Sequence, residues 1–208
     1  MAHLSSRHIK EAVRYIEDNK FEEAIAILKE FVKENHSTIE GWYNLGVAYA
    51  MIEDHEGAIR SYDEALAIDN GIFEIWFNKG AVLYEIADFK AAKKCYEEAL
   101  SLRPDDAEAW NNLGNVYSRL GDGKNAIKAY TRAVLLDTEY AEAFYNKASA
   151  HFIEEEYEQA VAYANLALGI DPELAERIQP WVQIARKKLE AKRKHEERSQ
   201  KKKQRDSR

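Results

Sequence analysis

Apolar and small residues recur along the chain at the spacing of amphipathic helices. Stretches of roughly a dozen residues carry them at steps of three and four, and short polar turns separate these stretches. One such stretch includes Trp42, Leu45, Gly46 and Tyr49, and another begins after the polar turn at residues 53–55. The pattern predicts two antiparallel helices joined by a short turn.

This two-helix pattern repeats every 34 residues without insertion or deletion. The aromatic positions that define the period are Trp42, Trp76, Trp110 and Phe144. Four residues after each of them stands a small residue, at Gly46, Gly80, Gly114 and Ala148. We expect these small residues to let the two helices of a pair approach closely, with alanines opposite them on the second helix at Ala58, Ala92, Ala126 and Ala160.

The motif W-x-x-L-G-x-x-Y, followed by Ala, Tyr, Ala and a closing Pro, resembles the tetratricopeptide repeat. The resemblance implies an all-α, right-handed superhelical solenoid of antiparallel helix pairs. Five units are expected, at 5–38, 39–72, 73–106, 107–140 and 141–174. Apolar residues at helical spacing then predict a C-terminal capping helix at 175–195, with Pro180 kinking it or starting a second helix. The basic tail at 196–208 has no apolar residue to bury, so we expect it to be disordered.

Two polar columns run through the same register of four consecutive units. The first column is Asn44, Asn78, Asn112 and Asn146. The second column lies one helical turn earlier, at Glu40, Glu74, Glu108 and Glu142. Helix packing has no need of asparagine at these positions, and residues four apart share one helix face, so the columns are candidates for a binding surface.

The resemblance places the first helix of each unit on the concave surface of the solenoid. A carboxamide has two donors and an acceptor, so a row of them can hold the backbone of an extended peptide. The arrangement is similar to the asparagine ladder in the superhelical repeat domain of O-linked N-acetylglucosamine transferase. Tyr43, Phe77 and Tyr145 either add apolar area to this surface or pack against adjacent helices. The competing interpretation is that these Asn and Glu side chains are ordinary solvated residues of the repeat consensus.

Charge is distributed unevenly between the body of the chain and its end. Residues 186–208 carry 12 Lys and Arg against 4 Asp and Glu, which leaves 18 against 33 for residues 1–185. The basic end is interpreted as a solvated terminus, as an attachment site for nucleic acid or an anionic surface, or as a competitor for an acidic groove. An acidic groove repels the C-terminal carboxylate of Hsp70 and Hsp90, so that partner is not expected.

The remaining chemistry points away from catalysis. Cys95 is the single cysteine, the six histidines have no ligand spacing, and no phosphate-binding or nucleophile motif is present. We therefore expect no enzyme activity, no cofactor and no metal site. No apolar run is long enough to cross a bilayer, which predicts a cytoplasmic protein without membrane insertion. The expected function is a protein-binding scaffold, and the alternative is a nucleic-acid-associated adaptor that acts through the tail.

Overall fold

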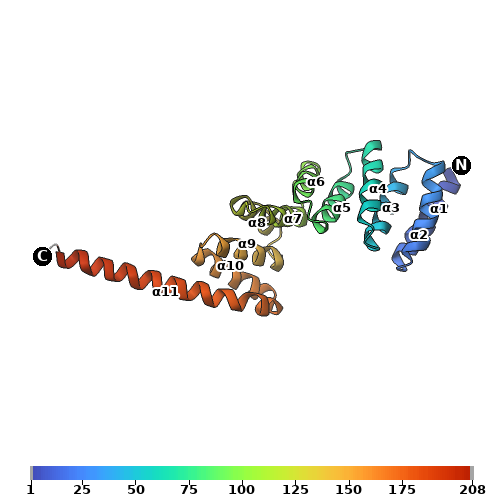
Figure 1. Ribbon diagram of the computed structural model, residues 1–208. Helices are drawn as coiled ribbons and strands as arrows, with labels where there is room; N and C mark the ends of the chain where they lie inside the picture. Colours follow the sequence, from blue (N-terminus) through green and yellow to red (C-terminus); the bar gives the residue numbers. More distant parts are fainter. Residues whose placement is uncertain (1, 207–208) are drawn as a thin grey trace. The chain divides into compact units, whose positions relative to one another are not determined.

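The computed structural model describes residues 2–206, and within this range the secondary structure is entirely helical (Figure 1). The chain divides into two compact units, residues 1–105 and 106–208, which are described separately. The N-terminal unit contains α1 (Ala2–Glu17), α2 (Phe21–Glu34), α3 (Ile39–Met51), α4 (His55–Ile68), α5 (Phe73–Glu85) and α6 (Phe89–Leu102). The C-terminal unit contains α7 (Ala107–Arg119), α8 (Gly123–Leu136), α9 (Ala141–Ile153), α10 (Tyr157–Ile170), the short 3-10 helix η1 (Pro172–Leu174) and α11 (Ala175–Asp206).

The helices form antiparallel pairs because each short turn reverses the chain by the same hydrogen-bond pattern. After α3, the N–H of Glu53 donates to the carbonyl of Ala50, and the N–H of Asp54 donates to the carbonyl of Tyr49. This is the Schellman motif, and it requires a left-handed residue after the helix, here Glu53 with a φ of 61°. Left-handed residues recur at the same place in the other turns, at Asn19, Ala87, Gly121 and Glu155.

Aspartate begins the second helix in three of these pairs. The carboxylate of Asp54 accepts a hydrogen bond from the N–H of Gly57 at 2.9 Å. Asp88 and Asp122 make the equivalent bonds at the starts of α6 and α8. These carboxylates satisfy N–H groups that have no partner within the helix, so each local sequence fixes where the second helix starts.

The glycines on the first helices lie closest to tyrosine rings of the second helices. A Cβ added to Gly46 would lie 2.6 Å from the ring of Tyr62, and one added to Gly114 would lie 2.5 Å from the ring of Tyr130. Gly80 has Tyr96 opposite it at 3.2 Å. Alanines at the expected second-helix positions are fully buried, but the large rings make the closest approach to each glycine. These positions therefore require glycine, because a tyrosine ring occupies the space that a side chain would need.

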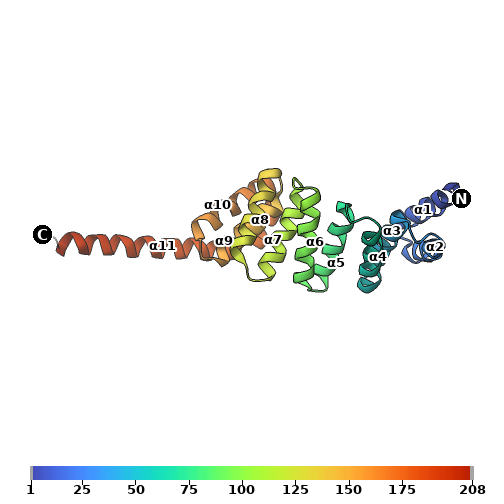
Figure 2. The same ribbon diagram turned by 90° about the horizontal axis from the view of Figure 1, so that it is seen from above.

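The last helix is longer than the sequence predicts. α11 runs without a break to Asp206 and contains Pro180 within its second turn, so neither the helix end near residue 195 nor the disordered tail is observed in the described residues. Ile178, Val182 and Ala185 are buried against the preceding pair, whereas residues 190–200 are exposed. Ala, Glu, Lys, Arg and Gln dominate this extension, and their high helix propensity accounts for a helix that no packing supports. Figures 1 and 2 show the extension reaching beyond α9 and α10.

Candidate functional site

Most of the candidate asparagines are held by hydrogen bonds within their own unit. In the N-terminal unit, the Asn78 side-chain amide donates to the hydroxyl of Tyr43 at 3.0 Å, which joins α5 to α3. Asn44 donates instead to the backbone carbonyl of Glu40, one turn earlier on the same helix, at 2.7 Å. The hydrogen bonds thus orient two members of the column, and the other amide N–H and the oxygen of Asn78 have no partner among the described residues.

In the C-terminal unit, too, an asparagine of the column donates a hydrogen bond to the first helix of the preceding pair, but the acceptor is an asparagine and not a tyrosine. The amide of Asn146 on α9 donates to the side-chain oxygen of Asn111 on α7 at 3.0 Å. Asn111 in turn donates to the hydroxyl of Tyr140 at 3.3 Å, and it is 3% exposed. The side chain of Asn112 is half-buried and has no hydrogen bond to the part of the chain that the structure describes. The bonded pairs therefore lie on the side where the first helices of neighbouring pairs meet.

Sequence reasoning missed Asn111 because it treated that register as an aromatic column. Asn111 lies 34 residues after Phe77 and 34 before Tyr145, so the signal was a polar residue in a position that is otherwise aromatic. A buried amide needs hydrogen-bond partners, and it receives them from Asn146 and Tyr140. Asn111 thus links Asn146 of the asparagine column to Tyr140, the residue just before α9.

Two members of the acidic column are paired with arginines that sequence reasoning did not single out. The carboxylate of Glu74 lies 2.5 Å from the guanidinium of Arg103, which also covers the ring of Phe73 at 3.9 Å. This hydrogen bond holds the pKa of Glu74 below its usual range. Glu142 receives a two-pronged contact from Arg177 on α11, with both N–O distances at 2.8 Å.

Arg177 also covers the predicted aromatic residue of the last pair. Its guanidinium carbon lies 4.1 Å from the centre of the Tyr145 ring. The hydrogen bonds to Glu142 raise the pKa of Arg177, so the charged form of the guanidinium is stabilised. Arg177, near the start of α11, therefore contacts two of the three candidate residues of the fifth pair, Glu142 and Tyr145.

The other candidates divide between packing and exposure. Phe77 packs within its own pair, stacked on Phe73 and edge-on to Tyr96, which supports the packing interpretation of this residue. The Tyr43 ring is half-buried, and this burial raises the pKa of its hydroxyl. Glu40 and Glu108 are exposed to solvent. The exposed carboxylates and the half-buried amides of Asn44, Asn78 and Asn112 are the part of the predicted surface that is open to a ligand.

The structure also bears on the single cysteine, on metal binding and on membrane insertion. Burial raises the pKa of the Cys95 thiol to about 11, so the thiolate is scarce at neutral pH. Among the described residues, no cluster of His, Cys, Asp and Glu has the arrangement of a metal site. No helix in the described range is both long enough and apolar enough to span a membrane.

Family profiles identify the class of protein that this fold and its repeated surface define. One tetratricopeptide repeat profile matches residues 39–71 and 107–140, and a second one matches residues 141–174. A related TPR repeat profile matches residues 88–121. Together these matches cover more than half of the chain. The chain belongs to the tetratricopeptide repeat family, whose scaffolds commonly mediate protein–protein interactions.

Solved structures share the fold at low sequence identity. MamA of Desulfovibrio magneticus RS-1 has a TM-score of 0.77 at 24% identity, covering 81% of this chain and 96% of that one. YrrB, described as a TPR protein with an unusual peptide-binding site, has a TM-score of 0.74 at 23% identity, covering 86% and 90%. PilF of Pseudomonas aeruginosa has a TM-score of 0.70 at 20% identity, covering 91% and 92%. No curated protein sequence matches the chain.

Proposed function

We propose that the protein is a noncatalytic scaffold that binds an extended segment of a partner protein along its first helices. The binding groups are the amides of Asn44 and Asn78 in the N-terminal unit, with Glu40 beside them. In the C-terminal unit the corresponding groups are Asn112 and Glu108. YrrB, which shares the fold, is described as binding peptides, and this supports a peptide as the ligand.

The observation that carries the proposal is the hydrogen bond from Asn78 to Tyr43. It uses one N–H of the amide and fixes the side chain, so the second N–H and the oxygen are held in place before a ligand arrives. A preorganised group loses less conformational entropy on binding than a mobile one. Exposed carboxylates nearby favour a partner segment that is basic or neutral.

The test is a peptide selected from a random library on the full-length chain. Its affinity is then measured for the double variant Asn44→Ala with Asn78→Ala. Each lost hydrogen bond is worth about 0.5–1.5 kcal/mol, so the dissociation constant should rise about 5- to 150-fold. Unchanged affinity would remove the amides from the binding surface.

Two further variants separate binding from folding. Tyr43→Phe removes the bond that orients Asn78 but leaves the amide, so it should weaken binding less than the double variant does. Asn165→Ala changes an exposed asparagine on the second helix α10 and should leave affinity unchanged. A loss with Asn165→Ala as large as that with the double variant would indicate that the peptide binds elsewhere.

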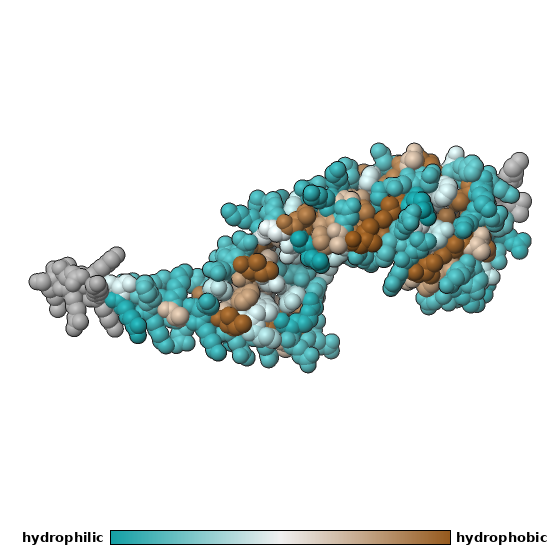
Figure 3. Space-filling view, in the orientation of Figure 1, coloured by the Kyte–Doolittle hydropathy of each residue, from teal (hydrophilic) through white to brown (hydrophobic). Residues whose placement is uncertain are grey.

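An alternative function is supported by α11. Its extension presents Lys and Arg side chains on a continuous exposed helix, and Figure 3 shows this part of the surface as mostly hydrophilic. Clustered cations of this kind bind phosphates with little sequence preference. If the protein is a nucleic-acid-associated adaptor, the chain 1–195 should lose most of its RNA retention in a filter-binding assay at low salt. Equal retention by both chains would exclude a role for the tail.

A further inference from the structure

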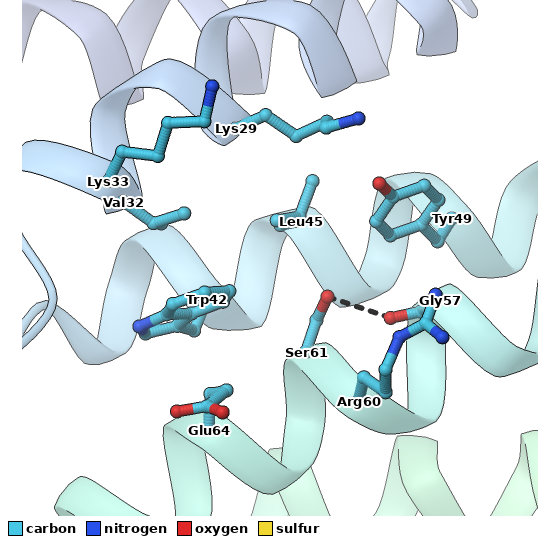
Figure 4. A pocket seen from close by; sticks show the side chains of 10 residues that line it. All are labelled: Lys29, Val32, Lys33, Trp42, Leu45, Tyr49, Gly57, Arg60, Ser61 and Glu64. Atoms are coloured by element: carbon cyan, nitrogen blue, oxygen red, sulfur yellow. Dashed lines mark hydrogen bonds between the residues drawn. The ribbon is translucent and has the colours of Figure 1, made fainter.

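A groove lies on the opposite face of α3 from the asparagine and glutamate columns. Trp42, Leu45 and Tyr49 form its floor, and the neighbouring helices α2 and α4 form its walls (Figure 4). Successive helix residues are rotated by about 100°, so this face and the one that carries Asn44 point in opposite directions. The groove has a volume of about 290 Å³ and lies wholly within the N-terminal unit.

The groove is open because the α4 wall has small residues. Gly57 and Ser61 line it, and the Ser61 hydroxyl turns away to donate to the carbonyl of Gly57 at 2.8 Å. Three repeats later the residue in the register of Ser61 is Tyr163. A tyrosine in this register occupies the space that serine leaves empty.

The equivalent place in the fifth pair is filled by a polar cluster. Lys147 and His151 stand in the registers of Leu45 and Tyr49, and both pack on the Tyr163 ring. The Lys147 ammonium lies 3.9 Å from the ring centre, and the His151 ring is stacked on Tyr163 at 5.3 Å. Lys147 is 5% exposed and His151 is 7% exposed. The side chains that leave this groove open in the second pair are thus replaced in the fifth pair by a ring with two polar groups packed on it.

The rim of the groove is basic although the body of the chain is acidic. Lys29, Lys33 and Arg60 line it, with Glu64 as the single carboxylate among the lining residues. Lys29 has no carboxylate partner among the described residues. Lys33 and Arg60 are paired with exposed glutamates of their own helices, at 2.5 Å in both cases. Exposed pairs of this kind are weak, so both cations can turn toward a ligand.

We propose that this groove binds an acidic segment of a partner protein that inserts one aromatic or aliphatic side chain. The inserted side chain lies on Trp42 and Leu45, and carboxylates on either side of it meet Lys29, Lys33 and Arg60. The groove volume of about 290 Å³ lies just below the range for small-molecule sites, about 300–1,000 Å³, so the groove suits one or two side chains better than a cofactor. This surface is separate from the amides of the first helices and takes a ligand of opposite charge.

The test uses the synthetic peptide acetyl-Glu-Asp-Phe-Glu-Asp-amide and the full-length chain labelled with ¹⁵N. The chain has four tryptophans, so the indole N–H signals of Trp76, Trp110 and Trp181 are internal references for that of Trp42. Only the Trp42 signal should shift as the peptide is added, and the shift should saturate. The same peptide with Ala in place of Phe, or with Lys in place of the acids, should bind at least tenfold more weakly. No shift of Trp42, or equal binding of the lysine peptide, would overturn the proposal.

Variants of the rim and the floor complete the test. Lys29→Glu with Lys33→Glu changes two exposed side chains, so the fold should be kept while peptide affinity falls at least tenfold. The matched control, Lys124→Glu with Lys128→Glu on α8, has the same change of charge and spacing and should bind normally. Ser61→Tyr should close the groove as Tyr163 does in the fifth pair. Equal loss in rim and control variants would refute a specific site, and Asn78→Ala should leave the Trp42 shift intact whether or not the first-helix proposal holds.

Discussion

The second and fifth helix pairs share one repeat frame but place a tyrosine of the second helix differently. In α3 and α4, the ring is Tyr62, which lies beside Gly46 and is 1% exposed. In α9 and α10, the residue in the register of Tyr62 is Ala164, and the ring comes one position earlier, at Tyr163. A shift of one residue rotates the ring by about 100° around the second helix.

This rotation decides which space is filled and which is left open. With the ring at Tyr62, the first helix must carry glycine, and the groove beside Ser61 stays empty. In the fifth pair, the registers of Gly46 and Tyr62 hold Ala148 and Ala164, which belong to one buried cluster. Lys147 and His151 pack on the Tyr163 ring. Helix pairs with the same 34-residue period can therefore have different surfaces, depending on the position of one tyrosine in the second helix.

The largest expected effect comes from removing the ring of the fifth pair. Tyr163→Ala should destabilise the protein by about 2–4 kcal/mol in urea unfolding. The change leaves a cavity, and it removes the aromatic ring that faces the buried Lys147 ammonium. Lys147→Met in the same background should recover part of this loss, since an apolar side chain needs no compensating charge. If Lys147→Met worsens the defect, the ring does not stabilise the cation.

An intermediate effect is expected where the rings meet the small residues. Gly46→Ala should destabilise the chain by about 1–2 kcal/mol, because the added methyl overlaps Tyr62 and this outweighs the better helix propensity of alanine. Ala148→Gly, the reverse change in the fifth pair, should cost about 1–2 kcal/mol, because glycine has the poorer helix propensity and a fully buried methyl group is lost. Urea unfolding of both variants measures the difference. A neutral or stabilising Gly46→Ala would show that Tyr62 moves away freely.

The smallest effect is expected at the exposed arginine–glutamate contacts, one of which lies within each unit. Arg103 lowers the pKa of Glu74 below its ordinary value of 4.5, so the carboxylate contributes stability above that pH and loses it as the pH falls through the lowered value. Because the pair is about half exposed, the contribution should stay below about 1 kcal/mol. An NMR titration of Glu74 should show its pKa rising toward 4.5 in the Arg103→Gln variant. A pKa that does not change would assign the shift to another group.

The architecture follows from local patterns that the sequence contains in full. A fixed 34-residue period and polar turns predict helix pairs, because each pair depends on residues close together in the chain. The structure adds the aspartates that cap the starts of α4, α6 and α8, which are equally local. The length of α11 was predicted wrongly. Residues with high helix propensity extend a helix that is already started, even where they bury no apolar surface.

The sequence predicts the candidate surface only as a column of asparagines and a column of glutamates, without the partners that hold them. The sequence places Asn78 and Asn146 in one register, but it does not show that Tyr43 and Asn111 accept their hydrogen bonds. It also does not show that Arg177, from the capping helix, covers Glu142 and Tyr145. These contacts join residues 32 to 35 positions apart, so they depend on how neighbouring helix pairs pack.

The sequence by itself determined the repeat, the pairing of helices and the registers of the polar columns, because these depend on side-chain periodicity and on turns a few residues long. Only the tertiary structure decided which amides remain open, which carboxylates are neutralised and where a groove forms. Those outcomes depend on the volumes of side chains that meet from different helices. A serine at position 61 and a tyrosine at position 163 stand in the same register, and only the packing around them shows that one leaves a space and the other fills it.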